Sequence, residues 1–207
     1  MNLHKPLAFH YYSYRRFYLL FWFPIIFLNG LFLYLKLEYY FQSTIFLVFF
    51  NLFFSYSLGS YEYQKLMPNY LFLKPGKIPF FYSSLIFSGV NALIQTSCLI
   101  ILYFGFSIPI ENIFFFPFVF FASIFAFVFA AFLTLLLNLS KKIQIFIELI
   151  LLGGFAYLFK GRMNEVFDYL REFLYNKDFL LKSIPILIAS SGILFGLIYL
   201  KFKLIKK

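Results

Sequence analysis

The stretch that decides the fold is Ile113–Leu137, IFFFPFVFFASIFAFVFAAFLTLLL, which contains no charged residue. A helix needs about 20 mostly apolar residues to cross the hydrocarbon part of a lipid bilayer. This stretch is longer than that, and most of its side chains are aromatic or aliphatic. We therefore expect Ile113–Leu137 to span a membrane.

Stretches of the same kind recur along the whole chain of 207 residues. The other predicted spans are Phe17–Leu35, Phe41–Leu58, Phe80–Phe104, Ile143–Phe159 and Ile184–Leu200. Hydrophobic residues make up 63% of the chain and charged residues 13%, whereas soluble domains are about half apolar and about a quarter charged. The sequence therefore predicts an all-α membrane protein with six transmembrane helices, built as a single transmembrane domain over residues 1–207.

The basic residues between the predicted spans indicate an orientation. The N-terminus, the second and fourth loops and the C-terminal tail together contain twelve Lys and Arg, against six on the other side. Lys and Arg concentrate in cytoplasmic loops, so we expect both termini in the cytoplasm of a bacterial-type inner (plasma) membrane. The net charge of +10 lies in these short loops, and we expect membrane lipids and no nucleic acid as partners.

Two segments outside the predicted spans have patterns typical of helices at a membrane surface. His10–Arg16 mixes aromatic and basic residues, which favours an N-terminal helix lying at the membrane surface. Gly161–Asn176 repeats apolar residues at intervals of three and four, which predicts an amphipathic helix. On the predicted topology this second helix lies on the extracellular side, either as an interfacial connector or as a lid over an exit path.

The third predicted span carries a polar stripe. Its members recur at helical spacing and share one face: Ser84, Ser88, Asn91, Gln95 and Cys98. Polar side chains inside a bilayer seek protein or water rather than lipid. The stripe therefore indicates either hydrogen bonding between helices or a candidate translocation path.

One predicted span contains a formal charge, the intramembrane carboxylate Glu148. An acid inside the membrane is a candidate for proton coupling or substrate contact. Glu148 also lies about 9 Å along the helix from the basic residue Lys142. The alternative is therefore a carboxylate near the interface that pairs with a cytoplasmic base such as Arg15, Arg16 or Lys141.

The residues that membrane enzymes use are scarce. His4 and His10 both precede the first predicted span, so we expect no histidine inside the membrane and no base within reach of the serines. The single cysteine, Cys98, excludes an intramolecular disulfide and a cysteine metal cluster. No phosphate-binding glycine loop with a lysine is present. We therefore expect no catalytic residues, no metal and no cofactor, and the protein is not expected to be an enzyme.

The most distinctive loop is residues 60–79, between the second and third predicted spans. It is too long for a tight turn, and its apolar side chains give it a face to bury: Tyr63, Leu66, Met67, Tyr70, Leu71 and Leu73. In its position and layout this loop resembles the coupling segment of the permease subunits of type-2 ABC exporters. Four residues match the family's places, although Lys74 interrupts the usual leucine-proline pair: Glu62, Leu73, Pro75 and Lys77.

This resemblance implies a membrane-spanning permease subunit that moves an amphiphilic substrate, such as a peptide, a lipid-linked molecule or a drug. A separate subunit would hydrolyse the ATP, and the permease would form a homodimer or pair with a second permease subunit. Glu62 would either dock on a basic partner surface or cap the coupling helix, and Leu71 and Leu73 would transmit coupling. Two other functions stay open: an importer module, and a non-transporting scaffold or assembly subunit of a membrane complex.

Overall fold

The computed structural model describes residues 7–14, 40–72, 76–105, 112–137, 143, 146, 150, 165, 169, 172–174 and 176–204. The described elements are α2 (Tyr40–Tyr61), the π-helix η1 (Glu62–Leu66), α3 (Met67–Phe72), α4 (Lys77–Gly105), α5 (Phe115–Leu137) and α8 (Lys177–Leu204). Residues 7–14 also form a helix, called here the N-terminal helix. The predicted all-α class is confirmed for this part of the chain.

Three of the described helices are long and apolar enough to cross a membrane: Lys77–Ile101, Phe115–Leu135 and Lys177–Leu204. They coincide with the third, fourth and sixth predicted spans, and α2 contains the second. The predicted span Phe17–Leu35 lies outside the described residues, and only residues 143, 146 and 150 of the fifth are described, all of them helical. The three apolar helices indicate a membrane protein.

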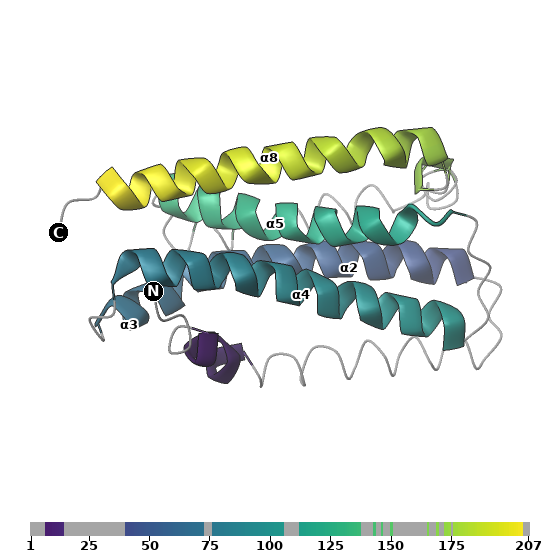
Figure 1. Cartoon of the computed structure of the whole chain (residues 1–207). Helices are drawn as coiled ribbons and strands as arrows, with labels where there is room; N and C mark the ends of the chain where they lie inside the picture. Colours follow the sequence, from purple (N-terminus) through teal and green to yellow (C-terminus); the bar gives the residue numbers. More distant parts are fainter. Residues whose placement is uncertain are drawn as a thin grey trace.

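The four long helices lie side by side (Figure 1). α5 packs against α2, α4 and α8, and it therefore forms the centre of the bundle. α4 runs in the direction opposite to the other three (Figure 1). The N-terminal helix, α3 and the C-terminal end of α8 all lie at the same end of the bundle, which we call the α3 end (Figure 1).

A glycine permits the closest approach between α2 and α5. A Cβ atom built at Gly59 would lie 2.2 Å from the carbonyl oxygen of Phe127 and 2.9 Å from its carbonyl carbon. Small residues allow helix backbones to pack this tightly in membranes. Gly59 therefore sets the distance between these two helices near the α3 end.

The segment predicted as a loop, residues 60–79, is largely helical. α2 continues without a break into η1 and α3, and the chain turns at Gly76, whose φ of 95° is one that glycine adopts without steric cost. Burial of one face explains the helix, because Tyr63, Leu66 and Tyr70 all join the apolar core. The helix that contains the second predicted span therefore continues past Leu58, where the span was expected to end.

Lys201 links α8 to the end of α5. Its Nζ donates a hydrogen bond to the carbonyl oxygen of Leu135, in the last turn of α5. The last carbonyls of an α-helix generally lack a partner within the helix, and a cation there also complements the helix dipole. We expect Lys201→Met to lower the free energy of unfolding by about 1.5–3 kcal/mol, the usual contribution of a hydrogen bond to a charged group.

Denaturant unfolding in detergent measures this effect, and the exposed Lys203 of the same helix turn provides the control. Lys203→Met removes the same charge without a contact to α5, and its expected change is within about 0.5 kcal/mol. Equal losses in the two variants would contradict the role given to Lys201.

Candidate functional site

The candidate site surrounds Glu62, the first residue of η1. Its side chain is 0% exposed. The Nδ1 atom of His10, from the N-terminal helix, lies 3.0 Å from its Oε1 atom. The Tyr14 hydroxyl, one helix turn further along, donates a hydrogen bond to Oε2. The N-terminal helix is thus fastened to the end of α2 by both oxygens of one carboxylate.

His10 also reaches α4 through its second ring nitrogen. Its Nε2 atom lies 2.9 Å from the Ser83 hydroxyl oxygen. Ser83 uses its single proton to donate a hydrogen bond to the carbonyl oxygen of Phe80, at 2.8 Å. Ser83 must therefore accept from His10, and Nε2 carries a hydrogen. His10, Tyr14, Glu62 and Ser83 form one connected group, called here the histidine cluster.

Aromatic rings enclose the histidine cluster. The His10 ring stacks on Phe87, with centroids 5.5 Å apart and planes at 15°, and it also contacts Phe80 at 5.3 Å. Tyr14 stacks on the same Phe87 ring at 4.4 Å. These rings keep water away, since His10 is only 1% exposed. Electrostatic interactions are stronger in such an environment, and an unpaired charge there costs more.

Tyr63 is the next residue to Glu62 and lies outside the three spanning helices. Its ring meets Phe80 edge-on, with centroids 5.9 Å apart, and its side chain is buried. Burial raises the pKa of the Tyr63 hydroxyl well above its usual range, and the nearby charge of Glu62 adds to the effect. Tyr63 therefore stays neutral and supplies no second charge to the cluster.

Ser83, His10 and Glu62 are connected in space as the serine, histidine and acid of a hydrolytic triad are. Two features show that they do not form such a triad. In a triad the serine donates its proton to the histidine, whereas Ser83 donates to Phe80. A nucleophile must also be reachable by substrate, and Ser83 is fully buried. We interpret the cluster as a structural junction between three helices.

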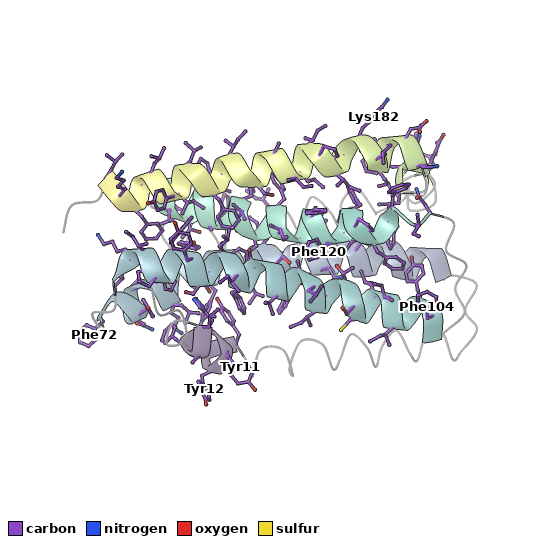
Figure 2. The ribbon with its side chains drawn as sticks, in the orientation of Figure 1. Tyr11, Tyr12, Phe72, Phe104, Phe120 and Lys182 are labelled. Atoms are coloured by element: carbon purple, nitrogen blue, oxygen red, sulfur yellow. The ribbon has the colours of Figure 1, made fainter. Side chains whose placement is uncertain are left out.

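One expectation from sequence is wrong at this place. His10 was expected ahead of the membrane-embedded part, without a serine in reach, yet it contacts α4 at Ser83. The N-terminal helix was expected to present its aromatic residues to lipid headgroups. Tyr11 and Tyr12 are 66% and 65% exposed and point away from the bundle (Figure 2), whereas His10 and Tyr14 are buried, so the surface location of this helix stays a prediction.

The predicted coupling residues lie in different environments. Glu62 is fully buried where α2 continues into η1, and its docking or capping role stays a prediction. Leu71 is half-buried against the apolar core. Lys77 opens α4. Leu73 and Pro75 lie outside the described residues.

The η1–α3 segment exposes one side to its surroundings. The residues of this side recur at helical spacing, and we call them the outer face: Lys65, Pro68, Asn69 and Phe72. Phe72 is 86% exposed and points outward from the bundle at its α3 end (Figure 2). Single exposed apolar side chains are common, so it is the place of Phe72 on the predicted coupling segment that makes it a candidate contact residue. The sequence pattern did not single out Phe72.

The polar stripe of α4 faces protein. Ser84, Ser88, Asn91 and Gln95 are all buried. The Ser55 hydroxyl of α2 donates to Gln95 Oε1 at 3.1 Å and accepts from Asn91 Nδ2 at 3.4 Å. These bonds join α2 and α4, which is one of the two roles expected for the stripe. Its role as a translocation path stays a hypothesis, and Glu148 lies outside the described residues.

His10, Tyr14 and Ser83 are the residues of the histidine cluster that the sequence-based set lacked. One sequence pattern could have indicated the cluster. His10 and Tyr14 are four residues apart, so a helix places them on one face, and Glu62 is the acidic residue nearest in sequence to the end of α2. Within the described residues no three His, Cys, Asp or Glu side chains gather as metal ligands would. The cluster therefore offers one acid and one imidazole for contacts within the protein.

Comparison of the chain with protein-family models, with curated proteins and with solved structures finds no significant match. A function therefore has to be argued from the residues and their geometry.

Proposed function

We propose that the protein is the membrane-spanning permease subunit of an ABC exporter, which moves an amphiphilic substrate with ATP hydrolysed by a separate subunit. The observation that supports this proposal is the η1–α3 segment. It is a short helical element between two long helices, fixed from inside by Tyr63, Leu66 and Tyr70, while Phe72 stands exposed on the other side. A rigid element with an exposed aromatic tip suits docking to a motor subunit.

The proposal includes six spans, both termini in the cytoplasm of a bacterial-type inner membrane, and a homodimer or a paired permease subunit. The arrangement at the α3 end supports the orientation, because the N-terminal helix, α3 and the end of α8 lie together there (Figure 1). Lys65, Lys77, Lys201 and Lys203 belong to the same end. A concentration of basic residues is typical of the cytoplasmic side.

The proposed mechanism is mechanical. Closure of the ATPase on its nucleotide would displace the outer face of η1–α3. Because η1 continues directly from α2, the displacement would pass into that helix, and through Gly59 into α5. Glu62 would carry it to the N-terminal helix through His10 and Tyr14. ATP binding would thus shift the bundle between two conformations.

Phe72 is the residue to test. Leu71 packs against the core, so its replacement would disturb folding as well as docking. We expect Phe72→Ala to weaken ATPase binding by about 10-fold or more, which is typical for an exposed aromatic anchor, with the unfolding of the permease unchanged. Co-purification and ATPase stimulation measure this with the motor subunit from the same membrane.

Phe104→Ala is the matched control, because Phe104 is 67% exposed at the opposite end of α4 (Figure 2). We expect it to leave the partner bound. If neither variant affects an associated ATPase, or if the purified complex contains no ATPase, the scaffold function becomes the better interpretation.

A further inference from the structure

The apolar core of the bundle is divided into two clusters, and α2, α4 and α5 contribute to both. The cluster nearer the α3 end includes Phe54 and Phe127, and the cluster toward the opposite end includes Val48 and Val119. The same three helices also bury polar side chains between these clusters. We call this set the polar layer: Asn51, Ser55, Asn91, Gln95 and Ser123.

Hydrogen bonds bring the α2 and α4 members of the polar layer together. The Ser55 hydroxyl donates to Gln95 Oε1 at 3.1 Å and accepts from Asn91 Nδ2 at 3.4 Å. Asn51 lies one helical turn before Ser55, on the same face of α2. Because α4 runs antiparallel to α2 (Figure 1), Gln95 is displaced from Asn91 in the same direction. The amide groups of Asn51 and Gln95 therefore belong to one level of the bundle.

α5 adds a hydroxyl group at the same level. Gly59 of α2 lies against the backbone of Phe127, and α2 and α5 run in the same direction (Figure 1). One turn before this contact, Ser55 of α2 and Ser123 of α5 are therefore level with each other. The α4 members of the polar layer lie inside the segment Lys77–Ile101, which is long and apolar enough to span a membrane. The polar layer thus lies deep within the bundle.

Three side chains of the polar layer have an unpaired hydrogen-bonding atom. Asn51 Nδ2, Gln95 Nε2 and Ser123 Oγ make no hydrogen bond within the part of the chain that the structure describes. These residues are 1%, 0% and 1% exposed, so bulk water does not reach them. Burying a polar group without a hydrogen bond is unfavourable. In folded proteins, internal water molecules commonly supply the missing bonds at such places.

We propose that the polar layer is a water-binding site inside the bundle, with an apolar cluster on either side of it. The amide nitrogens of Asn51 and Gln95 donate to water oxygen, and the Ser123 hydroxyl can donate or accept. The five residues of the layer carry no formal charge, which suits a neutral ligand. Water there lets α2, α4 and α5 exchange hydrogen bonds without leaving a buried group unpaired. The site requires only this chain and does not depend on the proposed transport function.

Water-edited solid-state NMR tests the proposal on the full-length, isotope-labelled protein in phosphatidylcholine–phosphatidylglycerol vesicles. The experiment measures how fast magnetisation passes from water to each assigned side chain. We expect rapid transfer to the side-chain amides of Asn51 and Gln95, close to the rate at the exposed Asn69. Leu99 is the matched control, because it is 0% exposed and lies one turn beyond Gln95 on α4. Transfer to its methyl groups should be several-fold slower.

Asn51→Leu tests whether the water lies in the polar layer. Leucine removes one donor and occupies the space beside Gln95, so transfer to the Gln95 amide should slow several-fold while transfer to Asn69 stays the same. Transfer to Asn51 and Gln95 in the wild type that is as slow as transfer to Leu99 would overturn the proposal, whether or not the variant folds. Fast transfer to Gln95 that persists in folded Asn51→Leu would also overturn it, because the water would then lie elsewhere.

Discussion

Replacement of Glu62 by Ala is expected to lower the free energy of unfolding by about 2–6 kcal/mol, because each of the two buried polar groups that lose their contact with the carboxylate costs about 1–3 kcal/mol. The side chain is fully buried and accepts contacts from both His10 and Tyr14. Its removal takes the carboxylate away from both His10 and Tyr14 and opens a cavity among aromatic rings. Denaturant unfolding in detergent measures the loss, and proteolysis of the N-terminal helix should accelerate with it.

Two comparisons make this result specific. Glu165→Ala removes an exposed carboxylate and should change the free energy of unfolding by no more than about 0.5 kcal/mol. Glu62→Gln keeps the shape and a hydrogen-bonding group, and it should cost far less than Glu62→Ala. If Glu62→Ala is as stable as the wild type, the carboxylate does not hold the N-terminal helix in the way described.

Gly59→Ala should also be strongly destabilising. The added Cβ would lie 2.2 Å from the backbone oxygen of Phe127, and a backbone atom in a helix cannot rotate away as a side chain can. Overpacking of this kind costs about 1–3 kcal/mol and occasionally more. We expect the upper end of that range, because α2 must move away from α5 along their contact. Thermal unfolding in detergent measures the loss.

Gly89 provides the matched control for this substitution. It lies within α4, and a Cβ atom there would have no neighbour within 4 Å. Alanine has a higher helix propensity than glycine by about 1 kcal/mol, so Gly89→Ala should be neutral or slightly stabilising. An equal loss of stability in Gly89→Ala and Gly59→Ala would contradict the role given to the close contact between Gly59 and Phe127.

The helices of the bundle could be predicted from sequence, because the driving force acts locally along each helix. The runs of apolar residues in α4, α5 and α8 are long enough to span a bilayer whatever surrounds them. Their ends were less predictable. α8 begins at Lys177, well before the expected Ile184, since Asn176 accepts a hydrogen bond from the Phe179 backbone and caps the helix.

Most of the candidate site could not be predicted from sequence, because its contacts join residues far apart in the chain. His10 and Ser83 are separated by 73 positions, and Tyr14 and Glu62 by 48. No local pattern records such pairs, since the residues meet only after the N-terminal helix folds against α2 and α4. The burial of Glu62 follows from the same contacts. The polar stripe was easier, because Asn91 and Gln95 share a face of one helix.

The π-helix η1 affects how this sequence aligns with a relative or a designed variant. A π-helical turn holds one residue more than an α-helical turn, so Glu62–Leu66 acts as a one-residue insertion. Deleting one residue there would turn the π-helical turn into an ordinary α-helical turn and leave the residues after it on the same faces. Tyr70 would stay in the core and Phe72 would keep its outward position. A relative with a single-residue gap at η1 should therefore present the same surface as this chain.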